Sequence, residues 1–175
     1  MKLKKYLILL TLLLSLLAAD VKIGYVDSNQ IMSNFEEVRQ VQVNLEKEQR
    51  RLENDFNELI AQLDSLQQDY ERQRLLMSET RRGEKENEII NLKKTAEEFQ
   101  LKKFGPEGEI YKKQNELLKP VLKKIDDAIQ KVGSDQGYDF ILDAMSGALL
   151  YALDSHNLTE DVMDELIKAT GSITE

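Results

Sequence analysis

The longest stretch without a helix-breaking residue is the feature that most restricts the fold of this chain. Neither glycine nor proline occurs in the 58 residues from Tyr25 to Arg82. Within it, apolar residues recur every three or four positions, with one missed position near Glu48 and Gln49. This heptad seam predicts a coiled-coil helix. The seam residues are Val38, Val41, Leu45, Leu52, Phe56, Leu59, Leu63, Leu66 and Tyr70. A helix of about 40 residues reaches about 60 Å, so we expect it to project from any compact body.

A second apolar series predicts a returning helix and therefore a helical hairpin arm over residues 35–120. We place the tip near residues 74–78, because Ser78 followed by Glu79 is typical of a helix N-terminus. The second series comprises Ile89, Leu92, Ala96, Phe99, Ile110, Leu117, Val121, Ile125, Ala128 and Val132.

The returning helix contains a predicted break. Gly105, Pro106 and Gly108 disfavour helix, and we expect this segment to lie opposite about Glu46 to Gln49, where the first seam misses a position. We interpret the coincidence as a kink or hinge; the alternative is a local bulge without mobility. Pro120 similarly predicts a bend where the helix rejoins the body.

Strand signals lie at the two ends of the mature chain. We expect strands at about 21–27, 137–143 and 148–153, with a short helix at about 160–168. These segments, within residues 20–34 and 121–175, form a small β body. Because so few strands make a marginal core, we expect oligomerisation. The residues predicted to form the core of the trimer and its body are Ile23, Tyr25, Tyr138, Phe140, Leu142 and Leu150.

The first 19 residues have the layout of a secretory signal peptide: three early lysines, an apolar run from Tyr6 to Leu17, and Ala18-Ala19. Cleavage is expected near Ala19, which makes the mature chain periplasmic; a retained membrane anchor is the weaker interpretation, since the run falls short of a bilayer span. No cysteine follows the run to carry a lipid.

Several kinds of chemistry lack support. The chain has no cysteine, which excludes disulfides and thiolate sites, and no phosphate-binding or dinucleotide motif. We therefore predict no cofactor, no metal site and no enzymatic activity. The single histidine, His156, fits a surface turn, and Asp135, Asp139 and Asp143 fit solvent-facing carboxylates better than a metal site. The mature chain, with 21 basic and 32 acidic residues, carries −11, which argues against nucleic-acid binding.

Four segments lie around the predicted hairpin in a characteristic order: KIGYVDSNQIM, LLKPVLKKIDDAIQKV, GYDFILD and LTEDVMDEL. With the hairpin, these segments make the chain resemble the Skp/OmpH periplasmic chaperones. The resemblance covers about Val21 to Lys168. It implies a mainly helical α+β fold and a homotrimer, with a shared β-barrel-like base and helical arms around a central cavity. It also implies that unfolded outer-membrane proteins are held there without ATP. The acidity of this chain departs from the basic, best-known members.

Two surfaces on the arm are candidate sites. Apolar residues outside the seam are the predicted client contacts: Leu75, Leu76, Met77, Ile90, Leu101 and Phe104. Basic residues near the tip are predicted to touch clients or an anionic membrane surface, although a solvated hairpin end is the simpler interpretation. They are Arg72, Arg74, Arg81, Arg82 and Lys85.

The sequence therefore predicts an ATP-independent periplasmic holdase for unfolded outer-membrane proteins, in which many weak apolar contacts act together. The alternative is a structural coiled-coil adaptor of the bacterial envelope that docks one folded partner.

Overall fold

The computed structural model describes residues 20–171, and most of them are helical. Contacts divide the described chain into two compact units, one spanning Asn34–Lys123 and one formed by the residues on either side. The mainly helical fold class is confirmed. The predicted signal peptide and its cleavage site near Ala19 lie outside the described residues.

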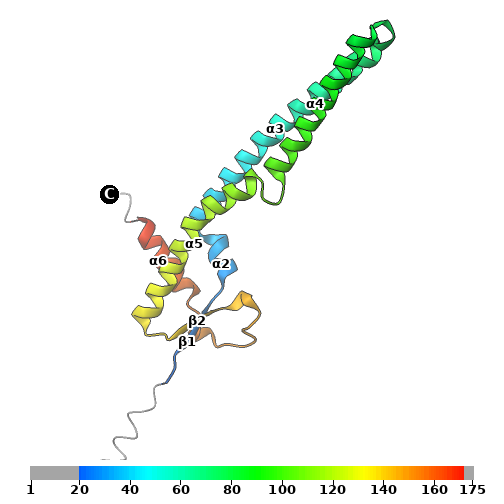
Figure 1. Ribbon diagram of the computed structural model, residues 1–175. Helices are drawn as coiled ribbons and strands as arrows, with labels where there is room; N and C mark the ends of the chain where they lie inside the picture. Colours follow the sequence, from blue (N-terminus) through cyan, green and yellow to red (C-terminus); the bar gives the residue numbers. More distant parts are fainter. Residues whose placement is uncertain (1–19, 172–175) are drawn as a thin grey trace, which may run out of the picture. The chain divides into compact units, whose positions relative to one another are not determined.

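The first unit is a long antiparallel helical hairpin. Helix α3 spans Glu36–Gln73, a 3-10 turn, η2, spans Arg74–Leu76, and α4 spans Glu79–Phe104. The two helices lie side by side (Figure 1). The Ser78 hydroxyl accepts a hydrogen bond from the backbone N–H of Arg81 at 3.3 Å, which caps the start of α4 as its sequence predicts. Helix α5, Glu109–Gln136, follows and continues through Pro120.

The hairpin buries only a narrow apolar strip. Leu52 and Ala96 are 1% and 4% exposed, whereas other seam residues such as Leu45, Leu59 and Leu63 are half-buried. A seam between two helices is covered from one side only, so its flanks stay in contact with solvent. The buried residues of this unit are Phe35, Val38, Val41, Leu52, Ala96 and Val121.

The second unit is a small α/β body. Strands β1 (Ile23–Val26) and β2 (Phe140–Asp143) pair in parallel, with Ile23 opposite Phe140. Two short 3-10 turns, η3 (Ala144–Ser146) and η4 (Asp154–His156), two helices, α2 (Ser28–Asn34) and α6 (Thr159–Gly171), and the part of α5 from Lys124 onward complete it. Its buried apolar residues are Val26, Ile31, Ile125, Ala128, Val132, Leu158, Val162 and Leu166.

The third predicted strand, at 148–153, is wrong for the chain as described. This segment forms neither helix nor strand, and Leu150 and Tyr151 are 95% and 81% exposed. It follows Gly147, whose φ of 78° turns the chain away from β2, and no strand of the described chain pairs with it. The two observed strands are also shorter than predicted, and α2 occupies a position where no helix was expected.

Polar contacts join distant parts of the body. The Asp143 carboxylate accepts a hydrogen bond from the Ser28 hydroxyl at 2.8 Å and one from the Met145 backbone N–H at 3.0 Å. The backbone N–H of Asp27 donates to the Thr159 hydroxyl at 2.9 Å. Hydrogen bonds from the Met145 backbone and from Ser28 hold the pKa of Asp143 below its ordinary value.

We expect Asp143→Asn to lower the free energy of unfolding by about 1–2 kcal/mol at pH 7, because charge-assisted hydrogen bonds are weakened. A depressed pKa in the folded state stabilises the fold above the ordinary pKa of about 4 and loses this contribution as the pH falls further. The difference between variant and parent should therefore shrink towards pH 3 in urea-unfolding curves.

Asp126→Asn is the matched control, because Asp126 is exposed and its side chain has no partner among residues 20–171. An equal effect of both substitutions would contradict a specific role for Asp143.

Candidate functional site

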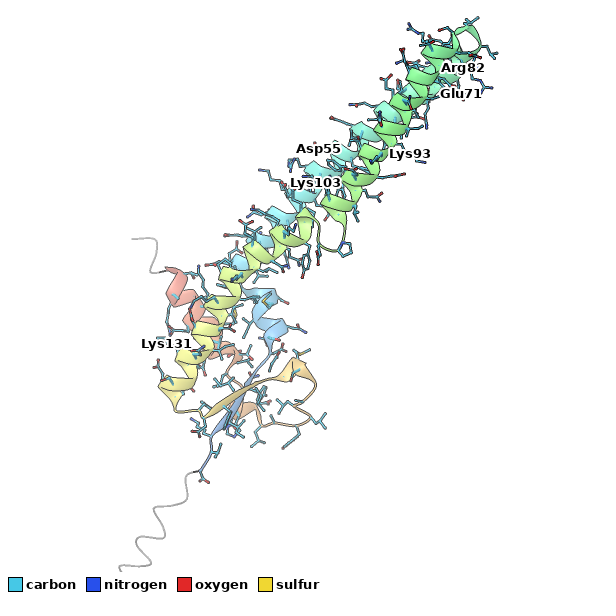
Figure 2. The ribbon with its side chains drawn as sticks, viewed as in Figure 1. Asp55, Glu71, Arg82, Lys93, Lys103 and Lys131 are labelled. Atoms are coloured by element: carbon cyan, nitrogen blue, oxygen red, sulfur yellow. The ribbon has the colours of Figure 1, made fainter. Side chains whose placement is uncertain are left out.

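Four of the predicted contact residues project into solvent from the hairpin. Leu75 and Leu76 at the tip are 85% and 90% exposed, and Ile90 and Leu101 on α4 are 61% and 68% exposed. Side chains project along the length of the hairpin in Figure 2. Burying such residues against a partner gains roughly 25 cal/mol per Å² of apolar surface. The hairpin thus offers several separate apolar contacts.

Phe104 and Met77 differ from this prediction. Phe104 is half-buried, and its ring lies 6.5 Å from that of Phe56 and 6.4 Å from that of Phe99, measured between centroids. Aromatic rings at this separation stabilise one another, so Phe104 packs inside the hairpin rather than standing free. Met77 is half-buried at the turn.

Two shallow grooves lie beside the exposed residues of α4. One, of about 500 Å³, is lined by Tyr70 of α3 and by Ile89 and Ile90 of α4, among others. The other, of about 310 Å³, includes Leu101 and Phe104 at the end of α4. Each groove is large enough to receive a bulky side chain, and neither encloses a small molecule.

The basic residues at the tip are mostly paired with nearby acids. Arg72 contacts Asp69, Arg74 lies 3.6 Å from Glu71, and Lys85 lies 2.6 Å from Glu88. The Arg81 guanidinium has no recorded partner within the described residues, and the buried Nε of Arg82 finds no acceptor there. Figure 2 places Glu71 and Arg82 near the same end of the hairpin. Only part of the predicted basic cluster is therefore available.

A hydrogen bond joins the two helices close to the tip. The Tyr70 hydroxyl of α3 donates to the Glu86 carboxylate of α4. Donating this bond to a carboxylate stabilises the protonated phenol, so the pKa of Tyr70 rises above its ordinary value. The contact fixes the register of the helices at this level.

The predicted break is present between α4 and α5. Residues 105–108 leave the helical path as a short loop (Figure 1), and the backbone N–H of Gly108 donates to the Gly105 carbonyl at 2.8 Å. Glu109, the first residue of α5, pairs with Lys103 before the loop and lies 3.7 Å from Arg51 of α3.

The break lies near the α3 residues predicted to face it. Glu48, within the predicted segment Glu46 to Gln49, pairs with Arg51, and Arg51 in turn lies 3.7 Å from Glu109, the first α5 residue after the loop. The ring of Phe56 lies beside that of Phe104, the last α4 residue before the loop. Mobility of the loop as a hinge stays a prediction.

The predicted body core faces solvent in the single chain. Ile23, Phe140 and Leu142 are 48%, 59% and 40% exposed, and Tyr25 and Tyr138 are half-buried. With Leu150, these residues therefore do not form the core of one chain. Strand alternation accounts for this pattern, because Gly24 and Val26, on the opposite face of β1, are the buried ones. A role of the exposed face in a trimer core stays a prediction.

Other exposed apolar residues were missed at the sequence level. On the hairpin they are Val43 and Ile60 of α3 and Tyr111 and Leu122 of α5; on the body they include Met145, Tyr151 and Leu153. Their displacement from the seam was the available signal. In residues 20–171, no helix is long and apolar enough to cross a membrane, and no group of three potential metal ligands occurs.

A long, polar helical hairpin with isolated apolar side chains, linked in sequence to a small α/β body, defines a protein class that presents an extended surface. Residues 22–166 match the family described as "Outer membrane protein (OmpH-like)". The chain belongs to this family.

Individual relatives agree with that assignment. "Chaperone protein Skp" of Yersinia enterocolitica is 29% identical over 93% of this chain and 99% of the relative. The protein of the same name from Vibrio cholerae serotype O1 is 28% identical over 81% of each chain. The crystal structure of a putative outer membrane chaperone (OmpH-like) from Caulobacter crescentus CB15 matches with a TM-score of 0.74 over 86% of each chain, at 14% identity. This last likeness is one of fold.

The loop geometry predicts that Gly108→Ala destabilises the hairpin, because an added Cβ would lie 2.7 Å from the Lys103 carbonyl oxygen and 2.9 Å from the Gly105 backbone nitrogen. We expect the thermal midpoint to fall. Gly83→Ala in α4 is the matched control, since its Cβ would meet nothing within 4 Å. Replacing a helical glycine there should raise stability by about 0.5–1 kcal/mol. Equal midpoints for the two variants would contradict the tight loop.

Proposed function

We propose that this protein is an ATP-independent holdase chaperone that binds unfolded outer-membrane proteins and prevents their aggregation. The observation that carries the proposal is the set of separate, strongly exposed apolar side chains along a hairpin that is otherwise polar. Weak contacts at several points of one flexible client add up to useful affinity through effective concentration. No contact is strong enough alone to prevent release, which suits delivery without nucleotide hydrolysis.

Family membership supports the same function. Two of the relatives described above carry the name Skp chaperone, and the structural neighbour is titled an outer membrane chaperone. We propose by this analogy that the protein acts in the periplasm, after removal of a signal peptide near Ala19, and passes its clients towards the outer membrane.

We further propose that the working form is a homotrimer held together by the bodies. The exposed apolar residues Ile23, Phe140, Leu142 and Leu150 lie within one small unit, and solvent exposure of this much apolar surface is unfavourable. Association of three copies would cover it, would give segment 148–153 a partner for its backbone, and would bring three arms around one cavity.

The arm tip is proposed to make a weak accessory contact with an anionic membrane surface. Leu75 and Leu76 are exposed there, and the Arg81 guanidinium, which has no partner in the described part of the chain, is close in sequence. Basic residues contribute about 1 kcal/mol each near anionic lipid, so this contact alone is weak.

The holdase proposal predicts that the mature protein keeps a denatured β-barrel protein soluble on dilution from urea, as measured by light scattering, without ATP. Replacing Ile90 and Leu101 together by Ser should raise several-fold the concentration of this protein needed to suppress aggregation, because two apolar contacts with the client are lost. Asn54→Ser, at an exposed polar position of α3, is the control. If the parent protein leaves the aggregation of the β-barrel protein unchanged, the holdase proposal is contradicted.

A structural adaptor that docks one folded partner is the alternative, and the exposed Leu75 and Leu76 at the tip are the feature that favours it. Purified unfolded proteins distinguish the two functions. A holdase binds several unrelated denatured outer-membrane proteins with similar affinity, whereas an adaptor binds none of them.

Trimerisation predicts a sedimentation coefficient that corresponds to three chains, and dissociation when Phe140→Asp is introduced, because a charge would enter an apolar interface. Ile167→Asp is the control, since Ile167 is 60% exposed but lies on α6 rather than beside the sheet. A parent protein that sediments as a monomer would contradict the trimer.

A further inference from the structure

The exposed apolar residues of the hairpin are unevenly divided between its two sides. We call α3 the ascending limb and residues 74–123 the descending limb. Six of the eight large apolar residues recorded as exposed in this unit belong to the descending limb. They are Leu75, Leu76, Ile90, Leu101, Tyr111 and Leu122; Val43 and Ile60 belong to the ascending limb. Val43 and Ile60 are 49% and 41% exposed, similar to Tyr111 and Leu122 at 50% and 44%, whereas the other four residues of the descending limb are 61–90% exposed.

The apolar residues of the descending limb are regularly spaced. Ile90 and Leu101 in α4 are eleven residues apart, and so are Tyr111 and Leu122 in α5. Eleven residues make about three turns, so each pair shares a helix face and is separated by about 16 Å. An extended chain advances about 3.3 Å per residue, so one pair can contact side chains four to six residues apart on the same face of that chain. Discrete anchors of this kind suit an extended partner.

Charge separates the two limbs as well. The ascending limb holds ten acidic and five basic residues, a net of −5, whereas the descending limb holds nine acidic and twelve basic residues, a net of +3. All four arginines of the ascending limb, Arg39, Arg50, Arg51 and Arg72, pair with acids of the same helix. Its arginines are therefore locally neutralised, and Lys47 is the one basic residue of this limb that makes no ion pair within residues 20–171.

The descending limb keeps positive charge available. Within the described residues, no hydrogen bond or ion pair engages the side chains of Arg81, Lys112 and Lys119. Lys112 is adjacent to Tyr111, and Lys119 lies one turn from Leu122. Exposed cations beside exposed apolar groups favour a partner that combines apolar side chains with carboxylates.

From these observations we propose that the descending limb is the client-binding side of each arm and selects unfolded segments in which large apolar residues accompany Asp or Glu. The acidic ascending limb disfavours the same segments by like-charge repulsion. This inference rests on the proposed holdase function and adds the side of the arm and the chemistry of the preferred segment. Surface charges are screened by salt, so the preference is a few-fold and falls as ionic strength rises.

The charge preference is tested with two short unstructured peptides that share the same Phe and Leu positions and carry either Glu or Lys elsewhere. The mature protein should bind the Glu peptide about three- to ten-fold more tightly in low salt, with most of the difference lost near 0.5 M salt. Fluorescence anisotropy measures both affinities. Equal affinities, or tighter binding of the Lys peptide, would overturn the proposal.

Matched variants locate the surface. Lys112→Glu with Lys119→Glu should remove the preference for the Glu peptide, whereas Lys47→Glu, at an exposed unpaired position of the ascending limb, should not. Ile90→Ser with Leu101→Ser should weaken both peptides several-fold, whereas Val43→Ser with Ile60→Ser should have little effect. If the Val43 and Ile60 substitutions weaken peptide binding as much as the Ile90 and Leu101 substitutions do, the assignment of binding to the descending limb would be overturned. Far-UV circular dichroism verifies that each variant keeps its helices.

The aggregation assay separates this inference from the proposed function. If the protein suppresses aggregation of a denatured β-barrel protein but shows no peptide preference, the holdase function stands and this inference is wrong. If the protein prefers the Glu peptide through the descending limb but fails to suppress aggregation, the binding surface stands and the chaperone function is contradicted.

Discussion

Packing between only two helices is the constraint on which the rest of the hairpin depends. A helix inside a globular domain is covered on most of its apolar face, but each limb of a hairpin has one neighbour. Leu52 and Ala96 occupy the covered centre of the seam, and residues such as Leu45 and Leu63 lie at its half-buried flanks. Contacts such as Tyr70 with Glu86 and Arg51 with Glu109 supplement this narrow strip and hold the register.

The same constraint explains how the hairpin can be stable and still present apolar side chains. Stability requires apolar residues only along the seam, so residues elsewhere are free to be polar or apolar. Ile90 and Leu101 lie outside the seam and remain 61% and 68% exposed, so they add little burial within the chain. Their exposure lowers solubility without compensating stability, which is expected of residues that serve a partner rather than the fold.

Much of this structure could be predicted because the helical signals are local and periodic. The seam from Val38 to Tyr70, the N-cap at Ser78 and the helix break at Gly105 each depend on neighbours within a few residues. The position of the break along α3 follows instead from counting residues on either side of the tip, and Arg51, which pairs with Glu109 there, lies two residues from the predicted segment Glu46 to Gln49.

Predictions for the body and for the candidate site were less successful. Alternation in β1 identifies two faces but not which one is buried within a single chain; Val26 lies on the buried face, whereas Ile23 is exposed there and stays a predicted trimer contact. Segment 148–153 is apolar enough for a strand, yet a strand also needs a neighbour, which the described chain does not provide. Phe104 is close in sequence to exposed Leu101, and only the approach of Phe56 from α3 reveals that its ring is packed.

The parallel pairing of β1 with β2 has a consequence for the order of folding. The hydrogen bond between Ser28 and Asp143 closes a separation of 115 residues, and that between Asp27 and Thr159 one of 132. Contacts so distant in sequence carry a large loop-closure cost and form slowly unless the intervening chain folds first. The contacts of the hairpin near its turn join residues that are closer in sequence, so the hairpin can form first, starting from the tip. Its formation brings the segments of β1 and β2 together. During synthesis, β1 emerges early but must wait for nearly the whole polypeptide before its partner strand exists.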